Sequence, residues 1–513
     1  MTYTVDRRAF LLASASLVVG SMWSCAAVVR HPNFITDPFQ LGVTSGDPTA
    51  DGVVLWTRLA PSPLDGGGMG TESVAVRWEI ARDERFAKIV SSGEVVAHAQ
   101  AGHSVHVEVN GLAAEHWYWY RFHVGAYVSP IGRTRTLPLT SALPTHLRLA
   151  VASYQNYEQG LYTALDHLAN DEPDLILFLG DYIYEYAGKD KQVRRHVGPE
   201  CTTLVHYRNR YAQYRSDPAL QRAHAQAPWI VTPDDHEFDN NCAGAISEEK
   251  NIDPVAYLAR RAAAYQAYFE HMPLRRSALP QGPDMQIYRR FALGRLAQID
   301  VADTRQYRTD QPCGDGNKPP CPEALDPAAT LLGVKQRQWL FDGWAQSSAT
   351  WNILAQQVMM GRVDRKAGEE QAFSMDQWPG YEMERRQVLQ YLHEKRIANP
   401  VVLAGDIHTN WANDLIGDFA GLNGRTIASE FVGTSISSGG NGIATPKNLD
   451  ALLQENSFVK YHNAQRGYLI INLQPKQLQC DFRVVSFVDK PGSPIDTAAS
   501  FVVESGIPGP KRW

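Results

Sequence analysis

An apolar run that stops abruptly at a glycine and an aspartate constrains the fold most strongly. From Pro173 the chain reads Asp-Leu-Ile-Leu-Phe-Leu and then turns polar at Gly180 and Asp181. An unbroken apolar run bounded by proline and glycine is typical of a strand buried on both faces. Ligands bind at the carboxyl ends of parallel strands. Asp181 therefore stands where a hard-oxygen metal ligand is expected, and the alternative is that it caps the next helix.

The same pattern of an apolar strand followed by polar residues recurs along the chain. The segments with strand character are residues 147–153, 174–180, 229–232, 296–301, 351–354 and 401–404. A helix expected over residues 160–170 links the first two strands into a βαβ unit. We expect these strands to lie in one parallel sheet, so that the residues after each strand converge on a single edge.

The side chains at these strand ends are almost all oxygen donors. The candidate metal ligands are Asp181, Tyr184, Asp234, Asp235, Asp406 and His408. The set contains no cysteine, which argues against structural zinc, whereas carboxylates suit Ca²⁺, Mg²⁺ or Mn²⁺ and tyrosine with histidine and aspartate suits trivalent iron. Because dense like charges repel unless cations neutralise them, the sequence predicts a multi-metal site, with helix caps and surface salt bridges as the alternative.

The chain before residue 140 has a different character. Four segments with strand character, separated by turn signals such as Asn110-Gly111, are residues 53–59, 74–80, 105–109 and 117–122. This spacing predicts an all-β sandwich over residues 37–140, similar to fibronectin type III or immunoglobulin modules. A chain of 513 residues is too long for one core, and we expect an α/β catalytic domain over residues 145–505.

Residues 1–30 resemble a twin-arginine export signal. Arg7 and Arg8 precede an uncharged segment, residues 9–29, that is diluted by small residues. The signal predicts the twin-arginine export machinery as a partner and a periplasmic or extracellular location. A membrane anchor is the alternative, because the segment is long enough to span, and Cys25 is a candidate for acylation. The net charge of −6 gives no support to nucleic-acid binding, and we expect no such module and a monomer.

The cysteines predict one disulfide. If Cys25 belongs to the signal, five of the six cysteines remain in an oxidising compartment. Cys313 and Cys321 flank a short loop rich in glycine and proline, whose ends can readily meet. We therefore predict a disulfide between them.

Three ordered motifs carry a family resemblance. They are Gly180-Asp181 with Tyr184, Asp234-Asp235-His236-Glu237, and Gly405-Asp406 with His408. Their order resembles the metallophosphoesterase superfamily, in a variant similar to PhoD-type alkaline phosphatases and phosphodiesterases, and the resemblance covers nearly the whole chain. It implies two packed mixed sheets flanked by helices in the catalytic domain. It also implies hydrolysis of phosphomonoesters or phosphodiesters by a metal-activated hydroxide at Fe³⁺ with Ca²⁺ beside it, with Mn²⁺ or Zn²⁺ as alternatives.

The resemblance assigns roles residue by residue. Asp181 would bridge metals, Tyr184 and His408 would hold the iron, and the calcium side would be held by Asp234, Asp235 and Asp406. His236 is expected to contact the transition state or leaving group, and the alternative is a structural histidine bonded by neighbouring carboxylates. Arg305 and Arg308 are candidates for a phosphate clamp, because guanidinium matches phosphate geometry, and a salt bridge to Asp303 is the alternative.

The chain departs from the family pattern at one expected iron ligand. Tyr154 stands in Ala152-Ser153-Tyr154-Gln155, where the family usually has cysteine. A second phenolate on Fe³⁺ is chemically sound, so Tyr154 is a candidate ligand. The alternative is that Tyr154 packs elsewhere and the first metal is held more weakly.

Two other functions remain open from the sequence. A phospholipase D-like phosphodiesterase would have an exposed apolar lip at the mouth of its active site. A non-catalytic phosphate- or metal-binding surface protein would bind phosphate without hydrolysis. Retention of Asp181, Asp235, His236, Asp406 and His408 favours an enzyme.

Overall fold

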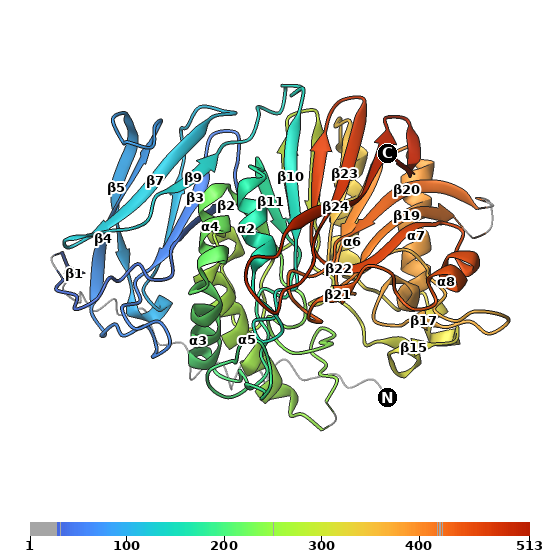
Figure 1. Ribbon diagram of the computed structural model, residues 1–513, viewed down its shortest axis with the longest axis horizontal. Helices are drawn as coiled ribbons and strands as arrows, with labels where there is room; N and C mark the ends of the chain where they lie inside the picture. The colour runs from blue at the N-terminus through green and yellow to red at the C-terminus, as the bar shows by residue number, and fades with distance from the viewer. Residues whose placement is uncertain (1–27, 31, 250, 418, 420–421, 423) are drawn as a thin grey trace.

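The computed structural model describes residues 28–30, 32–249, 251–417, 419, 422 and 424–513 (Figure 1). Almost all of the expected export signal, including Cys25, lies outside these residues. Within the described part of the chain, none of the helices has both the length and the apolar character needed to cross a bilayer.

The N-terminal region consists of two groups of strands around a shared core. A six-stranded sheet contains β1 (Val28–Val29), β4 (Ser73–Ala81), β5 (Ile89–Ala97), β7 (Trp117–Val124), β8 (Tyr127–Val128) and β9 (Gly132–Arg135). The second group is antiparallel and contains β2 (Val43–Gly46), β3 (Val53–Arg58) and β6 (Ser104–Val109). Leu55 and Val107 of this group share one buried cluster with Val76 and Tyr118 of the sheet. The four predicted strands are confirmed, and kinship with fibronectin or immunoglobulin modules stays a prediction.

The strands of the catalytic region are divided between two mixed sheets. The first sheet contains β10 (Leu147–Ala152), β11 (Leu175–Phe178), β12 (Trp229–Val231), β22 (Val459–Leu473), β23 (Gln477–Val485), β24 (Ile495–Glu504) and β25 (Ile507–Arg512). The second contains β13 (Arg289–Leu293), β14 (Ala297–Val301), β16 (Trp351–Ala355), β18 (Pro400–Ala404), β19 (Asn410–Gly417) and β20 (Arg425–Val432).

The prediction of one parallel sheet is therefore wrong, although each predicted strand forms. Three of the six strands lie in each sheet, and β10 pairs antiparallel with β22 on the edge away from β11. The N-terminal part of β22 also pairs with β19 and so joins the two sheets. An apolar run shows only that both faces of a strand are buried. It does not show whether a helix or a second sheet covers each face, so the division into two sheets could not be predicted from the sequence pattern.

The catalytic region has four layers, helix, sheet, sheet and helix. Leu149 and Leu177 of the first sheet share one buried cluster with Ile353 and Leu403 of the second. The outer face of the first sheet is covered by α2 (Thr163–Asn170), α3 (Leu204–Arg215), α4 (Pro218–Gln226) and α5 (Pro254–His271) (Figure 1). The outer face of the second is covered by α6 (Gly333–Gln346) and α7 (Glu382–Glu394). This confirms the two packed mixed sheets flanked by helices.

Smaller elements complete the chain. They are the helix α8 (Leu449–Glu455), the short strands β15 (Asn317–Lys318), β17 (Phe373–Ser374) and β21 (Gly442–Ile443), and the 3-10 turns Ala99–Ala101, Arg276–Ala278, Pro312–Gly314, Pro322–Leu325 and Trp378–Tyr381. The predicted disulfide between Cys313 and Cys321 is confirmed, and the loop that it closes contains β15, which pairs with β17.

The N-terminal strands are joined to the catalytic region through buried polar contacts. Strand β2 pairs with the start of β12 at Gly46 and Trp229. The Trp56 indole Nε1 donates to the carbonyl of Glu270 at 2.9 Å, and Arg58 Nη1 lies 2.7 Å from His271 Nε2. These side chains are fully buried, so the two regions share one continuous interior.

Candidate active site

The three parallel strands of each sheet end on the same side of the catalytic region, and the loops that follow them meet there. Four of the candidate site residues have left-handed backbone: Tyr154 (φ 60°), Asp181 (φ 50°), Asp406 (φ 65°) and His408 (φ 54°). This conformation is sterically unfavourable for residues with a Cβ atom and collects at functional sites. Gly180 (φ 113°) lets the β11 loop approach the β12 loop, because a Cβ atom there would lie only 2.4 Å from Asp234 Cβ.

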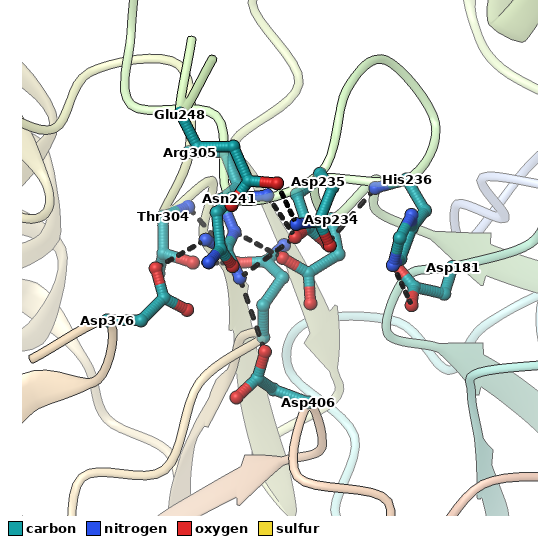
Figure 2. Close-up of polar contacts among 12 residues, drawn as sticks. Asp181, Asp234, Asp235, His236, Asn241, Glu248, Thr304, Arg305, Asp376 and Asp406 are labelled. Carbon is teal, nitrogen blue, oxygen red and sulfur yellow. Dashed lines mark hydrogen bonds and ion pairs between the residues drawn. The ribbon is translucent and has the colours of Figure 1, made fainter. Parts of the chain in front are cut away.

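Asp181 faces His236 at one side of the site (Figure 2). The Nε2 atom of His236 lies 4.0 Å from Asp181 Oδ2, and Asp235 offers a third ligand atom in the same group. Asp181 Oδ1 is buried and has no hydrogen-bond partner among the described residues. Burial and the neighbouring carboxylates raise the pKa of Asp181 well above its ordinary value, although His236 opposes the shift. An orphaned carboxylate oxygen of this kind suits a cation.

His236 is oriented by a second carboxylate. Its Nδ1 atom lies 2.7 Å from Glu185 Oε2, which leaves Nε2 directed toward Asp181. Burial disfavours the imidazolium, but Glu185, Asp181 and Asp235 outweigh it and raise the pKa of His236 well above its ordinary value. The ring is flanked by the rings of Tyr184 and Tyr186.

Tyr184 and His408 lie together, as the resemblance implied. The phenol oxygen of Tyr184 is 3.3 Å from His408 Nε2 and 2.7 Å from Ser438 Oγ. Burial and then the nearby Arg466 lower the pKa of His408 to about 3, so its imidazole is neutral and able to ligate a metal.

Asp234, Asp235 and Asp406 surround the guanidinium group of Arg305 (Figure 2). Arg305 Nε donates to Asp234 Oδ1 at 2.5 Å, and Nη2 donates to Asp406 Oδ1 at 3.2 Å and lies 3.8 Å from Asp235 Oδ2. Burial raises the pKa of Asp234 and of Asp406, with Arg305 opposing it in both cases. For Asp235 the positive charges of Arg305 and His236 outweigh burial and lower the pKa.

Tyr154 lies inside the site and does not pack elsewhere, whereas a weaker hold on the first metal stays a prediction. Its hydroxyl donates to Asp234 Oδ2 at 2.7 Å, and its ring centroid is 5.2 Å from that of His408. Burial and the surrounding carboxylates raise the pKa of this phenol well above its ordinary value. Whether Tyr154 ligates a metal stays a prediction.

Both candidate phosphate clamps are buried beneath carboxylates. The side chain of Arg305 is 3% exposed and that of Arg308 is 0% exposed, and both donate to Asp376 Oδ1, at 2.8 Å and 2.6 Å. Asp303, considered as their salt-bridge partner, instead accepts the backbone N–H groups of Arg305 and Gln306 through Oδ1. Contact with phosphate stays a prediction for both arginines.

Sequence reasoning missed three acidic residues of the site. Asp376 follows no buried strand, so no pattern marked it. Glu237 accepts the backbone N–H groups of Asp181 (3.1 Å), Tyr182 and Asp234 (2.8 Å), and burial raises its pKa to about 8 against these hydrogen bonds. Glu237 ends one of the three motifs and Glu185 directly follows Tyr184 in the sequence, but the contacts of both residues form only when the strands are brought together.

The donor set fits the implied metals. Buried carboxylates, two phenols and an imidazole are the ligands expected for Fe³⁺ with a neighbouring hard cation such as Ca²⁺. The carboxylates also outnumber the guanidinium groups that they contact, and an uncompensated buried charge is strongly unfavourable. The fold and the site together define a metal-dependent hydrolase.

Comparisons with known proteins identify the family. The model of the PhoD-like phosphatase family matches residues 149–482, and that of the N-terminal domain of PhoD-like phosphatases matches residues 24–138. The chain therefore belongs to the PhoD-like phosphatase family and is a phosphoester hydrolase.

Two relatives agree with this assignment. Alkaline phosphatase D from Bacillus subtilis (strain 168) is 48% identical over 521 residues, covering 99% of this chain and 89% of the relative. The solved structure described as "Structure of PhoD" superimposes with a TM-score of 0.91 at 49% identity, covering 94% of this chain and 93% of that chain. The resemblance expected from the motifs is confirmed.

Proposed function

We propose that this chain is an exported enzyme of the alkaline phosphatase D type, which hydrolyses phosphomonoesters, phosphodiesters or both at a centre of iron and calcium. The observation that carries the proposal is that His236 is directed at Asp181 in a site where loops from both sheets meet. These loops bring together Asp181, Tyr184, Asp234, Asp235, Asp406 and His408. Metal ions bound there supply Lewis acidity, which polarises phosphoryl oxygens and makes water nucleophilic at neutral pH.

The side chains divide into an iron side and a calcium side. Tyr184 and His408 would hold the iron, with Asp181 bridging and Tyr154 as a second phenolate in place of the usual cysteine. Asp234, Asp235 and Asp406 would hold the calcium side. The 2.7 Å hydrogen bond from Tyr154 to Asp234 supports this role, because it joins a proposed iron ligand to a proposed calcium ligand.

His236 is proposed to deliver a proton to the departing alcohol. Its Nδ1 is engaged by Glu185, so Nε2 is the atom that carries the proton toward the bound ester. The proton neutralises the negative charge that develops on the leaving oxygen as its bond to phosphorus breaks.

The remaining features of the proposal concern the whole chain. Export would follow the twin-arginine pathway to the periplasm or the exterior, with the signal in residues 1–30. A fibronectin- or immunoglobulin-like domain would span residues 37–140 and the catalytic domain residues 145–505. The enzyme would act as a monomer.

One experiment tests the proposal. Metal analysis of the exported protein is combined with assays on p-nitrophenyl phosphate, its bis-ester and phosphatidylcholine. Iron with calcium and turnover of either p-nitrophenyl ester supports the proposal. Turnover of phosphatidylcholine alone would make the chain a phospholipase D-like enzyme, and phosphate binding without turnover under any metal condition would contradict an enzymatic role.

A further inference from the structure

Arg305 occupies the centre of a group of carboxylates that come from separate loops. Asp234 and Asp235 follow β12, Asp406 follows β18, and Asp376 precedes the turn Trp378–Tyr381. Arg305 contacts all four, and its side chain is 3% exposed. The guanidinium group therefore faces protein carboxylates rather than the open mouth of the site.

Two of the candidate metal ligands around Arg305, Asp234 and Asp406, are held from two directions. Asp234 accepts from Arg305 on Oδ1 and, as long as the phenol of Tyr154 keeps its proton, from Tyr154 on Oδ2. Asp406 accepts from Arg305 on Oδ1 and from the Gln377 side-chain amide on Oδ2, at 2.8 Å. Two donors on opposite oxygens fix the plane of a carboxylate, and partners of this kind orient metal ligands and tune metal affinity.

Asp376 in turn fixes Arg305. Its Oδ1 atom accepts from Arg305 Nη1 at 2.8 Å, from Arg308 Nη1 at 2.6 Å and from Gln311 Nε2 at 2.9 Å. Asp376 has no other assigned role, and the arginines it holds approach it from the loop after β14. Asp376 therefore contacts Arg305, and Arg305 contacts the candidate metal ligands. We call this the order of contacts.

We propose that Arg305, anchored by Asp376, is a positioning residue that holds Asp234, Asp235 and Asp406 in the geometry that binds metal, and that it does not clamp the substrate phosphate. The inference rests on the proposed function, because these aspartates are its expected ligands. The planar guanidinium group of arginine can hydrogen-bond several carboxylates in fixed directions, whereas the ammonium group of lysine acts as a point charge and would hold them less well.

The first test compares metal binding with substrate binding. Metal-depleted wild-type protein and Arg305→Met are titrated with Ca²⁺ alone by calorimetry, and KM for p-nitrophenyl phosphate is measured at saturating metal. We expect Ca²⁺ affinity to fall roughly 10- to 100-fold in Arg305→Met, with KM unchanged within about threefold. Arg208→Met is the matched control, because it removes a guanidinium that pairs with Glu270 at 2.6 Å in the helical layer, and it should leave Ca²⁺ affinity unchanged.

The outcomes separate this inference from its rivals. Unchanged or tighter Ca²⁺ binding in Arg305→Met would overturn it, since tighter binding would mean that the guanidinium competes with the metal. A KM at least tenfold higher with normal Ca²⁺ affinity would make Arg305 a phosphate clamp. If wild-type protein itself binds no Ca²⁺ but binds another metal, the calcium assignment fails, and the same comparison is made with Mn²⁺.

A milder variant is less prone to misfold and tests whether Asp376 holds Arg305 in place. Asp376→Asn keeps the size of the side chain and removes the charge that holds Arg305, so Ca²⁺ affinity should fall in the same direction. If Asp376 acts through Arg305, the double variant Arg305→Met with Asp376→Asn should bind Ca²⁺ no more weakly than Arg305→Met alone. Arg305→Lys should recover part of the affinity. Additive losses in the double variant would overturn the assigned order of contacts.

Discussion

At the scale of one residue, Tyr154 stands where the resemblance leads us to expect a cysteine ligand of iron. The Tyr154 hydroxyl lies among Asp234, Asp406 and Asp181 and donates to Asp234. If Tyr154 is a phenolate ligand of Fe³⁺, Tyr154→Phe should weaken the visible charge-transfer band of the iron-loaded protein and shift its maximum. The measurement is absorption spectroscopy of protein with matched iron content.

A distant phenol provides the control for this measurement. Tyr120→Phe removes a buried hydroxyl in the N-terminal sheet and should leave the band unchanged. A spectrum of Tyr154→Phe identical to the wild type would leave Tyr184 as the only phenolate of the proposed set and would reduce Tyr154 to a hydrogen-bond donor for Asp234.

His236 provides a second prediction at this scale. Replacing it by Asn removes the Nε2 atom near Asp181, and a lost general acid typically lowers kcat by roughly 10²- to 10⁴-fold. The loss should be larger for an alkyl phosphate than for p-nitrophenyl phosphate, because the poorer leaving group depends more on protonation. His167→Gln, whose ring contacts the Ser493 carbonyl far from the site, is the control. Equal losses on both substrates would contradict the proton-donor role.

At the scale of elements, Glu237 fastens the loop after β11 to the loop after β12. It accepts three backbone N–H groups, two from the first loop and one from the second. Glu237→Gln should lower the free energy of unfolding by about 1–3 kcal/mol, because an amide cannot accept all three bonds. It should also lower the metal content, since both loops carry ligands. Urea denaturation and metal analysis measure the two effects.

Glu384 gives a matched comparison for Glu237. It is also buried and accepts backbone N–H groups, those of Leu331 and Leu332, but it lies on α7. Glu384→Gln should lower stability similarly and leave the metal content unchanged. Loss of metal from both variants would show that general loosening, rather than the loop connection, controls metal binding.

The elements that could be predicted from sequence are those with a local cause. The strand before Asp181 was predictable because an apolar run and a glycine lie in one short segment, and the Cys313–Cys321 disulfide because its loop is short. The pairing of Arg305 with Asp376 was not predictable, since it joins loops 71 residues apart through contacts that depend on the fold. The assignment of the strands to two sheets could not be predicted for the same reason.

At the scale of the molecule, the N-terminal and catalytic regions are coupled through Trp56 and Arg58. Arg58 is fully buried and contacts His271 and the Gly102 carbonyl, thus bridging the two regions. We expect one cooperative unfolding transition by calorimetry. Arg58→Met should lower the stability of the whole chain by roughly 1.5–3 kcal/mol, the range for hydrogen bonds to charged groups, without splitting the transition. Two separate transitions, of which only one moves, would contradict this coupling.

The left-handed backbone at Asp181, Asp406 and His408 restricts how this centre can be re-engineered. Aspartate, asparagine, histidine and glycine tolerate that conformation, whereas β-branched residues are genuine outliers in it. A library randomised at these three positions and selected only for folded protein, without selection for activity, should therefore be depleted of Val, Ile and Thr. Laboratory evolution toward a different metal would thus be restricted by backbone conformation before ligand chemistry is tested.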